Sequence, residues 1–189
     1  THQKGLYLLL EIATRVIEHP AQLAVLGSGE SAVESAFREL AAAYPGRAGC
    51  VIGYDEALAH LIEAGADIFV MPSRYEPCGL NQMYSMRYGT VPVVRATGGL
   101  ADTVIDCDDG TLASGAATGF AFREPAAAAL LAAIRRALEA WSDQAAWRKL
   151  QLNGMTREFG WGDSARRYRG LYQTLVAERA LANPGAGPG

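Results

Sequence analysis

The sequence predicts an α/β fold in which helices cover both faces of a Rossmann-like parallel sheet. Short apolar runs, typical of buried strands, alternate along the 189 residues with longer segments of helical periodicity. The connections between these segments are short and rich in glycine and proline. Right-handed crossovers place the carboxyl ends of such strands at one edge of the sheet, where ligands bind in open α/β folds. We therefore treat the loops at that edge as one candidate site.

The amino-terminal part predicts a helix followed by a strand. Apolar residues recur at helical spacing from Leu6 to Ile17. The pair His19-Pro20 ends this helix, because proline disfavours helical backbone in the residue before it. Residues 22–26 form a short apolar run that predicts a buried strand, closed by Gly27-Ser28-Gly29.

The same alternation then repeats. Residues 30–44 predict a helix that Pro45-Gly46 interrupts, and residues 49–52 predict the next strand. A helix follows over residues 55–64, with Asp55 as its N-cap.

The third and fourth strands are expected at residues 68–71 and 91–94. Between them, residues 81–88 can wind as a helix that stops at Gly89. Pro92 has no backbone N–H, so it is acceptable only near the start of its strand or at an edge of the sheet.

The rest of the chain is predicted to be mainly helical. After a turn at residues 97–100, residues 102–105 predict a short helix or loop, residues 106–118 a polar surface loop and residues 119–122 a last short strand. Three further helices are expected, at residues 125–141, 144–152 and 163–180. We expect residues 1–180 to form one domain and residues 181–189 to be a disordered tail.

Bulk properties argue against several classes of partner. A net charge of −3 and a sequence pI near 5.6 give no electrostatic basis for binding nucleic acid or an anionic membrane. No apolar stretch reaches the roughly 18 to 20 residues of a membrane-spanning helix. The three cysteines are widely spaced and odd in number, so they predict neither a disulfide framework nor a zinc site, and the cytoplasm is the expected location.

The most informative segment is Ser73-Arg74-Tyr75-Glu76-Pro77-Cys78-Gly79-Leu80-Asn81-Gln82, between the third strand and the next helix. Glu76 thus follows a strand and precedes a helix amino terminus, whose unpaired N–H groups and partial positive charge suit a phosphate. An acid beside an anion cradle is what transfer from a phosphate-activated substrate requires. The alternatives are that Glu76 is an ordinary surface acid or the ion-pair partner of Arg74.

Backbone groups are expected to supply the anion cradle. Cys78, Gly79 and Leu80 offer N–H donors, and Gly79 permits the close approach of a ligand oxygen. The helix end could instead lower the pKa of a nucleophilic Cys78. The three histidines fall in unrelated segments, which disfavours cysteine catalysis.

Other loops at the same edge add weaker candidates. Thr97, Gly98 and Gly99 form a second possible nest of N–H groups, although a glycine pair usually marks only a turn. Tyr54 could stack on a nucleobase or be a packed loop residue. Lys4 could neutralise a phosphate as a point charge, and on its own it would carry no weight.

A dinucleotide cofactor is not expected. Gly27-Ser28-Gly29 begins the fingerprint Gly-x-Gly-x-x-Gly, but Ala32 stands at its third glycine, a replacement that the motif permits. No acid sits at the end of the next strand, where Ile52-Gly53 stands, so NAD binding is disfavoured.

Together these residues resemble the carboxyl-terminal half of bacterial and plant-type glycogen (starch) synthases. The resemblance covers most of the chain, and its most specific block is Glu76-Pro77-Cys78-Gly79-Leu80. The other matching segments are Gln3-Lys4-Gly5, Ile52-Gly53-Tyr54, Tyr88-Gly89-Thr90, Thr97-Gly98-Gly99-Leu100-Ala101-Asp102-Thr103-Val104, Trp141, Trp147 and the helix with Trp161, Tyr168 and Leu171-Tyr172.

The resemblance implies one half of a two-domain GT-B glycosyltransferase, whose Rossmann-like domains face each other across a cleft. It implies the retaining transfer of glucose from ADP-glucose to the non-reducing end of an α-1,4-glucan, without a cofactor or a metal. Glu76 would hold the glucose hydroxyls and favour an oxocarbenium-like transition state, while Lys4 would contact the diphosphate. The N–H groups of residues 78–80 would bind the distal phosphate, Tyr54 would lie against adenine, and residues 97–99 would line the glucose subsite.

Two departures from related enzymes matter. Many retaining transferases carry a second glutamate that would fall at Tyr84, and its absence favours the glycogen/starch synthase branch. The resemblance also places an acceptor-binding domain and a first strand before Thr1, so we expect a domain lacking that strand and an inactive isolated chain. The remaining alternatives are a transferase that uses a UDP- or GDP-sugar and a non-catalytic nucleotide-binding module.

Overall fold

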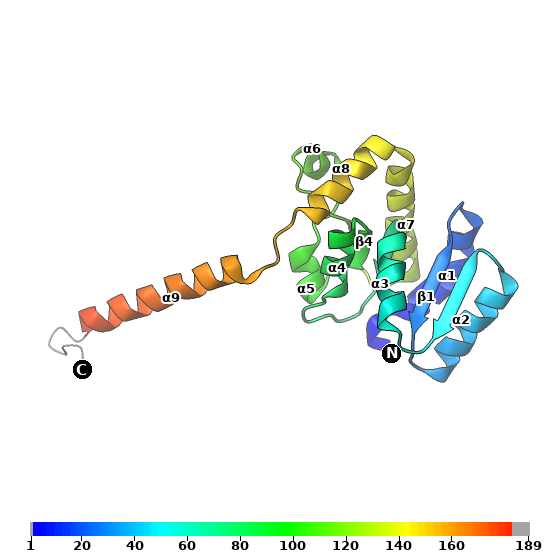
Figure 1. Ribbon diagram of the computed structural model, residues 1–189, viewed down its shortest axis with the longest axis horizontal. Coiled ribbons are helices and arrows are strands. Elements are labelled where there is room, and N and C mark those ends of the chain that lie inside the picture. The colour runs from blue at the N-terminus through cyan, green and yellow to red at the C-terminus, as the bar shows by residue number, and fades with distance from the viewer. Residues whose placement is uncertain (1, 183–189) are drawn as a thin grey trace. The chain divides into compact units, whose positions relative to one another are not determined.

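The computed structural model describes residues 2–182 and divides into two units between Arg157 and Glu158 (Figure 1). Residues 183–189, which make up most of the predicted tail, lie outside the described residues.

The first unit opens with helices that alternate with two strands. In chain order its elements are the 3₁₀ helix η1 (His2–Lys4), α1 (Leu6–Glu18), β1 (Leu23–Gly27), α2 (Ser31–Ala43), β2 (Ala48–Ile52) and α3 (Glu56–Gly65). β1 and β2 pair in parallel, in a register that runs from Leu23 opposite Ala48 to Gly27 opposite Ile52. Asp55 caps α3 as predicted, since its side chain accepts a hydrogen bond from Leu58 N–H at 2.9 Å.

The unit continues with three more strands. Its remaining elements are β3 (Ile68–Met71), α4 (Asn81–Tyr88), β4 (Val91–Arg95), α5 (Gly98–Thr103), α6 (Asp109–Ala113), β5 (Phe120–Phe122), α7 (Ala127–Ser142) and α8 (Gln144–Met155). The strands lie in the order β3-β4-β5 and all pairs are parallel. The parallel α/β class is therefore confirmed. Among the described residues the ladder falls into two sheets, β1-β2 and β3-β4-β5, rather than one continuous sheet.

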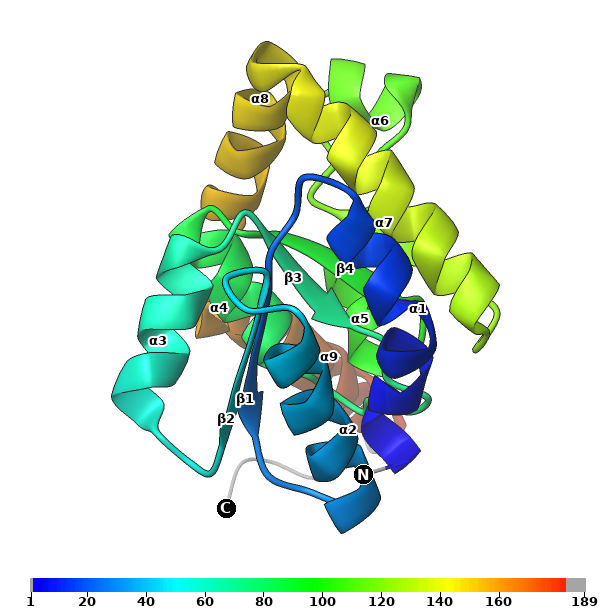
Figure 2. The same cartoon turned by 90° about the vertical axis from the view of Figure 1, so that its right-hand side faces the viewer.

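Successive residues of β4 show why helices cover both faces. Val93 is fully buried in a large apolar cluster that includes Leu130 and Ile134 of α7. Val94 points to the other face, where it packs with Met86 of α4. Figure 2 shows α7 and α4 on opposite sides of β3 and β4. Burial on both sides fixes the register of β4 and with it the loop that follows its carboxyl end.

Pro92 is tolerated in the central strand because of where pairing starts. It is the second residue of β4, opposite Phe69 of β3, whereas the pairing with β5 begins only at Val93. Val91 N–H donates toward β3, to Asp67 O at 2.9 Å, so the ring nitrogen of the next residue faces the β5 side before that ladder begins. The predicted position near the strand start is confirmed.

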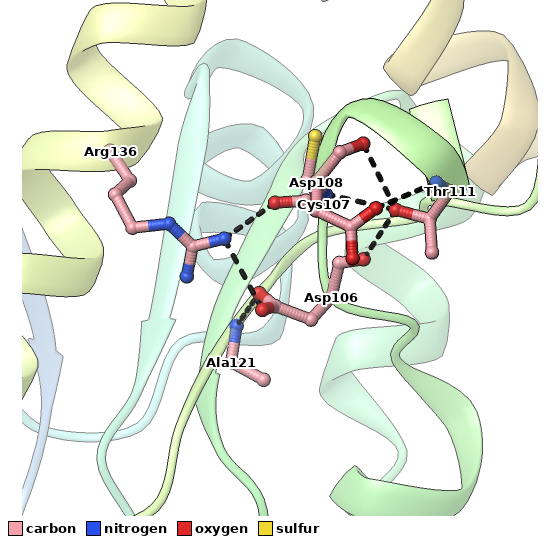
Figure 3. A network of polar contacts seen from close by, with 6 residues as sticks. All are labelled: Asp106, Cys107, Asp108, Thr111, Ala121 and Arg136. Atoms are coloured by element: carbon pink, nitrogen blue, oxygen red, sulfur yellow. Dashed lines mark hydrogen bonds and ion pairs between the residues drawn. The ribbon is translucent and has the colours of Figure 1, made fainter. Parts of the chain in front are cut away.

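The predicted surface loop at residues 106–118 contains a helix, α6, and this expectation was wrong in part. Asp108 accepts from Thr111 N–H at 2.8 Å, and Asp108 N–H donates to Thr111 Oγ1 at 2.9 Å, which makes a capping box. Asp106 accepts from Ala121 N–H at 2.7 Å and from Arg136 Nη2 at 3.2 Å (Figure 3). These polar side chains therefore satisfy the backbone groups of the segment and tie it to β5 and α7.

The second unit is formed by α9 (Trp161–Ala182), which contains the helix predicted at residues 163–180. Several of its described apolar side chains are exposed, among them Leu171, Leu175 and Val176. Tyr168 and Tyr172 lie one turn apart with their ring centroids 6.3 Å from each other. Within residues 2–182, no helix combines the length and apolar character that crossing a membrane requires.

Candidate functional site

Glu76 lies in the loop after β3, and the residue is only 7% exposed. Lys4 Nζ donates to its Oε2 at 2.6 Å, and Ser73 Oγ donates to the same oxygen at 3.2 Å. Both donors thus bind one oxygen, and no hydrogen bond of residues 2–182 uses Oε1. The acid is neither an isolated surface charge nor a fully paired one, because one oxygen remains able to accept from a ligand.

The start of the chain is fastened to this loop. Arg74 N–H donates to Gln3 O at 2.8 Å, and Gln3 Nε2 donates to Tyr75 O at 3.2 Å. Gly5 has a φ of 67°, and a Cβ there would lie 2.9 Å from the carbonyl carbon of Pro72 and closer still to its oxygen. Only glycine fits both the backbone conformation and the space. η1 is therefore held against the end of β3, which brings Lys4 to an acid far away in the sequence.

Arg74 is not the ion-pair partner of Glu76. Its Nε donates to the hydroxyl of Tyr7, and its guanidinium carbon lies 5.5 Å from the centroid of that ring. The ion pair is made by Lys4 instead. A guanidinium is held well by an aromatic face, whereas the lysine supplies a compact charge beside the acid.

A row of unpaired amides follows the acid. Gly79 has a φ of 70°, and Leu80 is the N-cap of α4 without a side-chain cap of its own. No hydrogen bond within residues 2–182 uses the N–H groups of Cys78, Gly79 or Leu80. These donors precede the amino terminus of an eight-residue helix, an arrangement that suits an anion.

The glycine pair before α5 packs directly on the acid loop. A Cβ on Gly98, whose φ is 46°, would lie 3.0 Å from the carbonyl carbon of Glu76 and closer to its oxygen. A Cβ on Gly99 would lie 2.5 Å from the carbonyl carbon of Cys78. Gly99 N–H donates to Glu76 O at 3.1 Å and to Pro77 O at 3.2 Å. The Gly99 amide therefore braces the acid loop and is not a free ligand donor.

The other two members of that predicted nest are placed differently from Gly99. Thr97 is the N-cap of α5, and its side chain makes no cap hydrogen bond. The N–H groups of Thr97 and Gly98 have no partner in the described part of the chain. These two residues remain available at the edge of the site.

Tyr54 follows β2 and is 88% exposed. None of the hydrogen bonds or ring contacts between described residues joins it to Glu76 or to the amide row. The structure thus leaves its ring free and does not pack it in a loop. Among the described residues, no three His, Cys, Asp or Glu side chains come together in a way that could hold a metal.

Two residues of the site were missed as functional groups in the sequence. Ser73 is buried and donates to Glu76, and Gln82 is buried and donates to backbone carbonyls of the amide row. The only local signal for Gln82 is its spacing, since a residue three or four positions after a turn on a helix can reach back to that turn. Nothing in the sequence distinguishes Ser73 from an ordinary loop serine.

Comparison with known proteins adds a family match and close relatives. Residues 1–151 match the family described as Glycosyl transferases group 1. The chain is 57% identical over 182 residues to the glycogen synthase of Aromatoleum aromaticum, covering 96% of this chain and 36% of that protein. It is 54% identical over 180 residues to the glycogen synthase of Dechloromonas aromatica, covering 95% and 37% respectively. This chain therefore spans little more than a third of these relatives and corresponds to their carboxyl-terminal part.

Solved structures agree with this match. The catalytic domain of starch synthase IV from Arabidopsis thaliana, bound to ADP and acarbose, superposes with a TM-score of 0.81 and 36% identity, covering 93% of this chain and 36% of that one. Sucrose-phosphate synthase from Thermosynechococcus elongatus superposes with a TM-score of 0.65 and 28% identity, covering 94% and 44%.

Proposed function

Because this chain belongs to the glycosyl transferases of group 1, we propose that it is the donor-binding half of a retaining glucosyltransferase. The enzyme moves glucose from ADP-glucose to the non-reducing end of an α-1,4-glucan in glycogen synthesis. The observation that carries the proposal is the convergence of Glu76, Lys4 and the amide row of residues 78–80 at the carboxyl end of β3. Identities of 50–57% to glycogen synthases support the choice within the family.

The anion-binding half of the site holds the diphosphate. The unpaired N–H groups of residues 78–80, before the amino terminus of α4, bind the distal phosphate. Lys4 contributes a positive charge within reach of the same edge, since its Nζ already lies 2.6 Å from Glu76. As the bond from the glucose to the diphosphate breaks, negative charge grows on the leaving group, and these donors stabilise it without a metal.

The sugar half of the site depends on Glu76. Its free Oε1 accepts hydrogen bonds from the glucose hydroxyls, while Oε2 stays fixed by Lys4 and Ser73. The carboxylate also favours the positive charge that develops on the sugar ring in the transition state. Thr97 and Gly98 line the glucose subsite, and Gly99 supports it from behind through its bond to the acid loop.

The nucleobase and the acceptor complete the assignment. Tyr54, with its exposed ring, stacks on adenine. The starch synthase IV structure, which contains ADP, supports ADP as the donor nucleotide. The glucan acceptor is bound by a domain outside this chain, as expected from the share of its relatives that the chain spans. We place the reaction in the cytoplasm, where the three free cysteines stay reduced.

Calorimetric titration of the chain with ADP, UDP and GDP tests the donor assignment. We expect ADP to bind most tightly; preference for UDP or GDP, or no binding of any of the three, would overturn it. ADP-glucose and ADP are then compared in Glu76→Gln, with Glu139→Gln on an exposed position of α7 as the matched control. The Glu76 variant should lose affinity for ADP-glucose and keep that for ADP, which a module that recognises only the nucleotide would not show.

An assay of glucose transfer to glycogen tests whether this chain binds only the donor while another domain binds the acceptor. We expect no useful turnover from this chain alone, because donor and acceptor must be held together in a closed cleft. Sustained transfer by the isolated chain would contradict the assignment of the acceptor to another domain.

A further inference from the structure

The side chain of Gln82 is fully buried in the first turn of α4 and faces the back of the amide row. Its Nε2 donates to Cys78 O at 3.3 Å, to Gly79 O at 3.1 Å and to Thr103 Oγ1 at 3.0 Å. The other amide atom, Oε1, is buried and has no hydrogen-bond partner among the described residues. A buried amide that leaves its own acceptor unpaired in order to bind two carbonyls requires an explanation.

The orientation of the Gln82 amide follows from its neighbours. Thr103 Oγ1 donates its proton to Gly99 O at 2.6 Å, so it can only accept from Gln82. The carbonyls of Cys78 and Gly79 are acceptors as well. All three atoms around Nε2 are therefore acceptors, so the atom that faces them must be a donor. If the amide were rotated by 180°, Oε1 would face these three acceptors instead.

The geometry of the peptide bond connects this side chain to the ligand edge. In a trans peptide the C=O and the N–H point in opposite directions. When Gln82 draws the carbonyls of Cys78 and Gly79 toward the protein interior, the N–H groups of the next residues, Gly79 and Leu80, turn outward. Both of these N–H groups lack a partner among residues 2–182.

The same side chain is linked to the loop that carries Glu76. Thr103, which accepts from Gln82, donates to Gly99 O, and Gly99 N–H donates to Glu76 O at 3.1 Å. Hydrogen bonds to Thr103 and to both backbone groups of Gly99 thus connect the amide row with the backbone of Glu76.

We propose that Gln82 is a positioning residue for the donor: it holds the Gly79 and Leu80 N–H groups aimed at the distal phosphate of a nucleoside diphosphate. It does not touch the reacting atoms. The proposal rests on the proposed function, because it concerns the same donor site. If the proposal holds, the gain in affinity that the distal phosphate gives to ADP over AMP depends on Gln82.

The test compares ADP with AMP, which lacks the distal phosphate. For the unaltered chain we expect ADP to bind far more tightly than AMP. Gln82→Met fills a similar volume but has no hydrogen-bond donor. We expect its affinity for ADP to fall about 10-fold or more, because hydrogen bonds to a charged phosphate are weakened. Its affinity for AMP should change little. A purely structural role would weaken both nucleotides alike.

Thr103→Val is the matched control, since it alters the same buried network but leaves the bonds from Gln82 to both carbonyls. It should keep the preference for ADP over AMP. If Gln82→Met keeps the preference as well, the positioning role is overturned while the proposed function stands. If the unaltered chain binds neither nucleotide, the proposed function itself fails.

A second measurement does not depend on the folding of a variant. In an amide NMR titration of the unaltered chain, ADP should shift the Gly79 and Leu80 N–H resonances strongly, as expected for new bonds to a phosphate oxygen. AMP should leave both nearly unchanged. Equal shifts with ADP and AMP, or no shift with ADP, would contradict the proposal.

Discussion

Replacement of Gly99 by alanine tests how tightly the two glycine-bearing loops of the site are packed. A Cβ at this position would lie 2.5 Å from the carbonyl carbon of Cys78 and 2.7 Å from its Cα. Carbon atoms in proteins normally approach to no less than about 3.5 Å, so one of the two backbones must move by about 1 Å. The obstacle is backbone, and no side-chain rotation relieves it.

This displacement has two expected consequences. Overpacking of this kind lowers the free energy of unfolding by about 1–3 kcal/mol, and each kcal/mol lowers the Tm of a domain of this size by about 2–4 °C. The movement also shifts Cys78, the first residue of the amide row, and strains the bonds from Gly99 N–H to Glu76 O and Pro77 O. We therefore expect ADP to bind about 10-fold more weakly or worse, because charge-assisted bonds are sensitive to geometry.

Thermal unfolding and calorimetric titration with ADP measure both effects. Gly49→Ala in β2 is the control, since a Cβ there meets nothing within 4 Å and the residue does not have a positive φ. The reasoning is refuted if Gly99→Ala matches the unaltered chain in both Tm and ADP affinity. If Gly99→Ala lowers the Tm but keeps the affinity for ADP, only the inferred link between the packing of the two loops and ADP binding is refuted.

Three further outcomes are expected. Lys4→Ala should weaken ADP binding by removing a positive charge from the site, whereas Lys149→Ala on α8 should not, as measured by titration at low and high salt. Cys78→Ser should keep both ADP binding and, in a full-length enzyme, glucose transfer, because that residue contributes backbone; lost transfer with intact binding would revive a catalytic thiol. Burial raises the pKa of Glu63, an effect that the nearby His60 only partly offsets, so the folded state binds more protons than the unfolded state just above pH 4.5, and stability falls as the pH rises through that window. Glu63→Gln should flatten this part of the stability curve in urea unfolding at pH 4 to 8, and an unchanged slope would count against the pKa shift.

The elements of the fold were predictable where local signals decide them. The strand at residues 68–71 and the helix at residues 81–88 match β3 and α4, and Gly89 ends the helix with a φ of 83°. The helix α6 was missed although Asp108 and Thr111 stand at capping-box spacing, because the surrounding polar residues are equally typical of a loop. The division of the strands into two sheets depends on long-range pairing, which periodicity does not encode.

The candidate site was predictable as a set of loops but not as a set of bonds. Parallel topology alone places the acid and the glycine-rich segments at one edge. Glu76 pairs with Lys4 and not with Arg74 because η1 packs beside the acid loop. Lys4 and Glu76 are 72 positions apart in the sequence, so no local pattern predicts this contact. The use of the Gly99 amide as a brace likewise depends on a contact between two loops that no local pattern reveals.

The shared oxygen of Glu76 has an entropic consequence. A carboxylate without partners rotates about its terminal bond and must be ordered when a ligand binds. Immobilising such a side chain costs about 0.5–1.5 kcal/mol. Lys4 and Ser73 both donate to Oε2, so this rotation is already restricted by contacts within the folded chain. For the proposed glucose transfer, the lone pair of Oε1 would therefore have a fixed direction before the hexose binds, because the carboxylate is ordered when the chain folds.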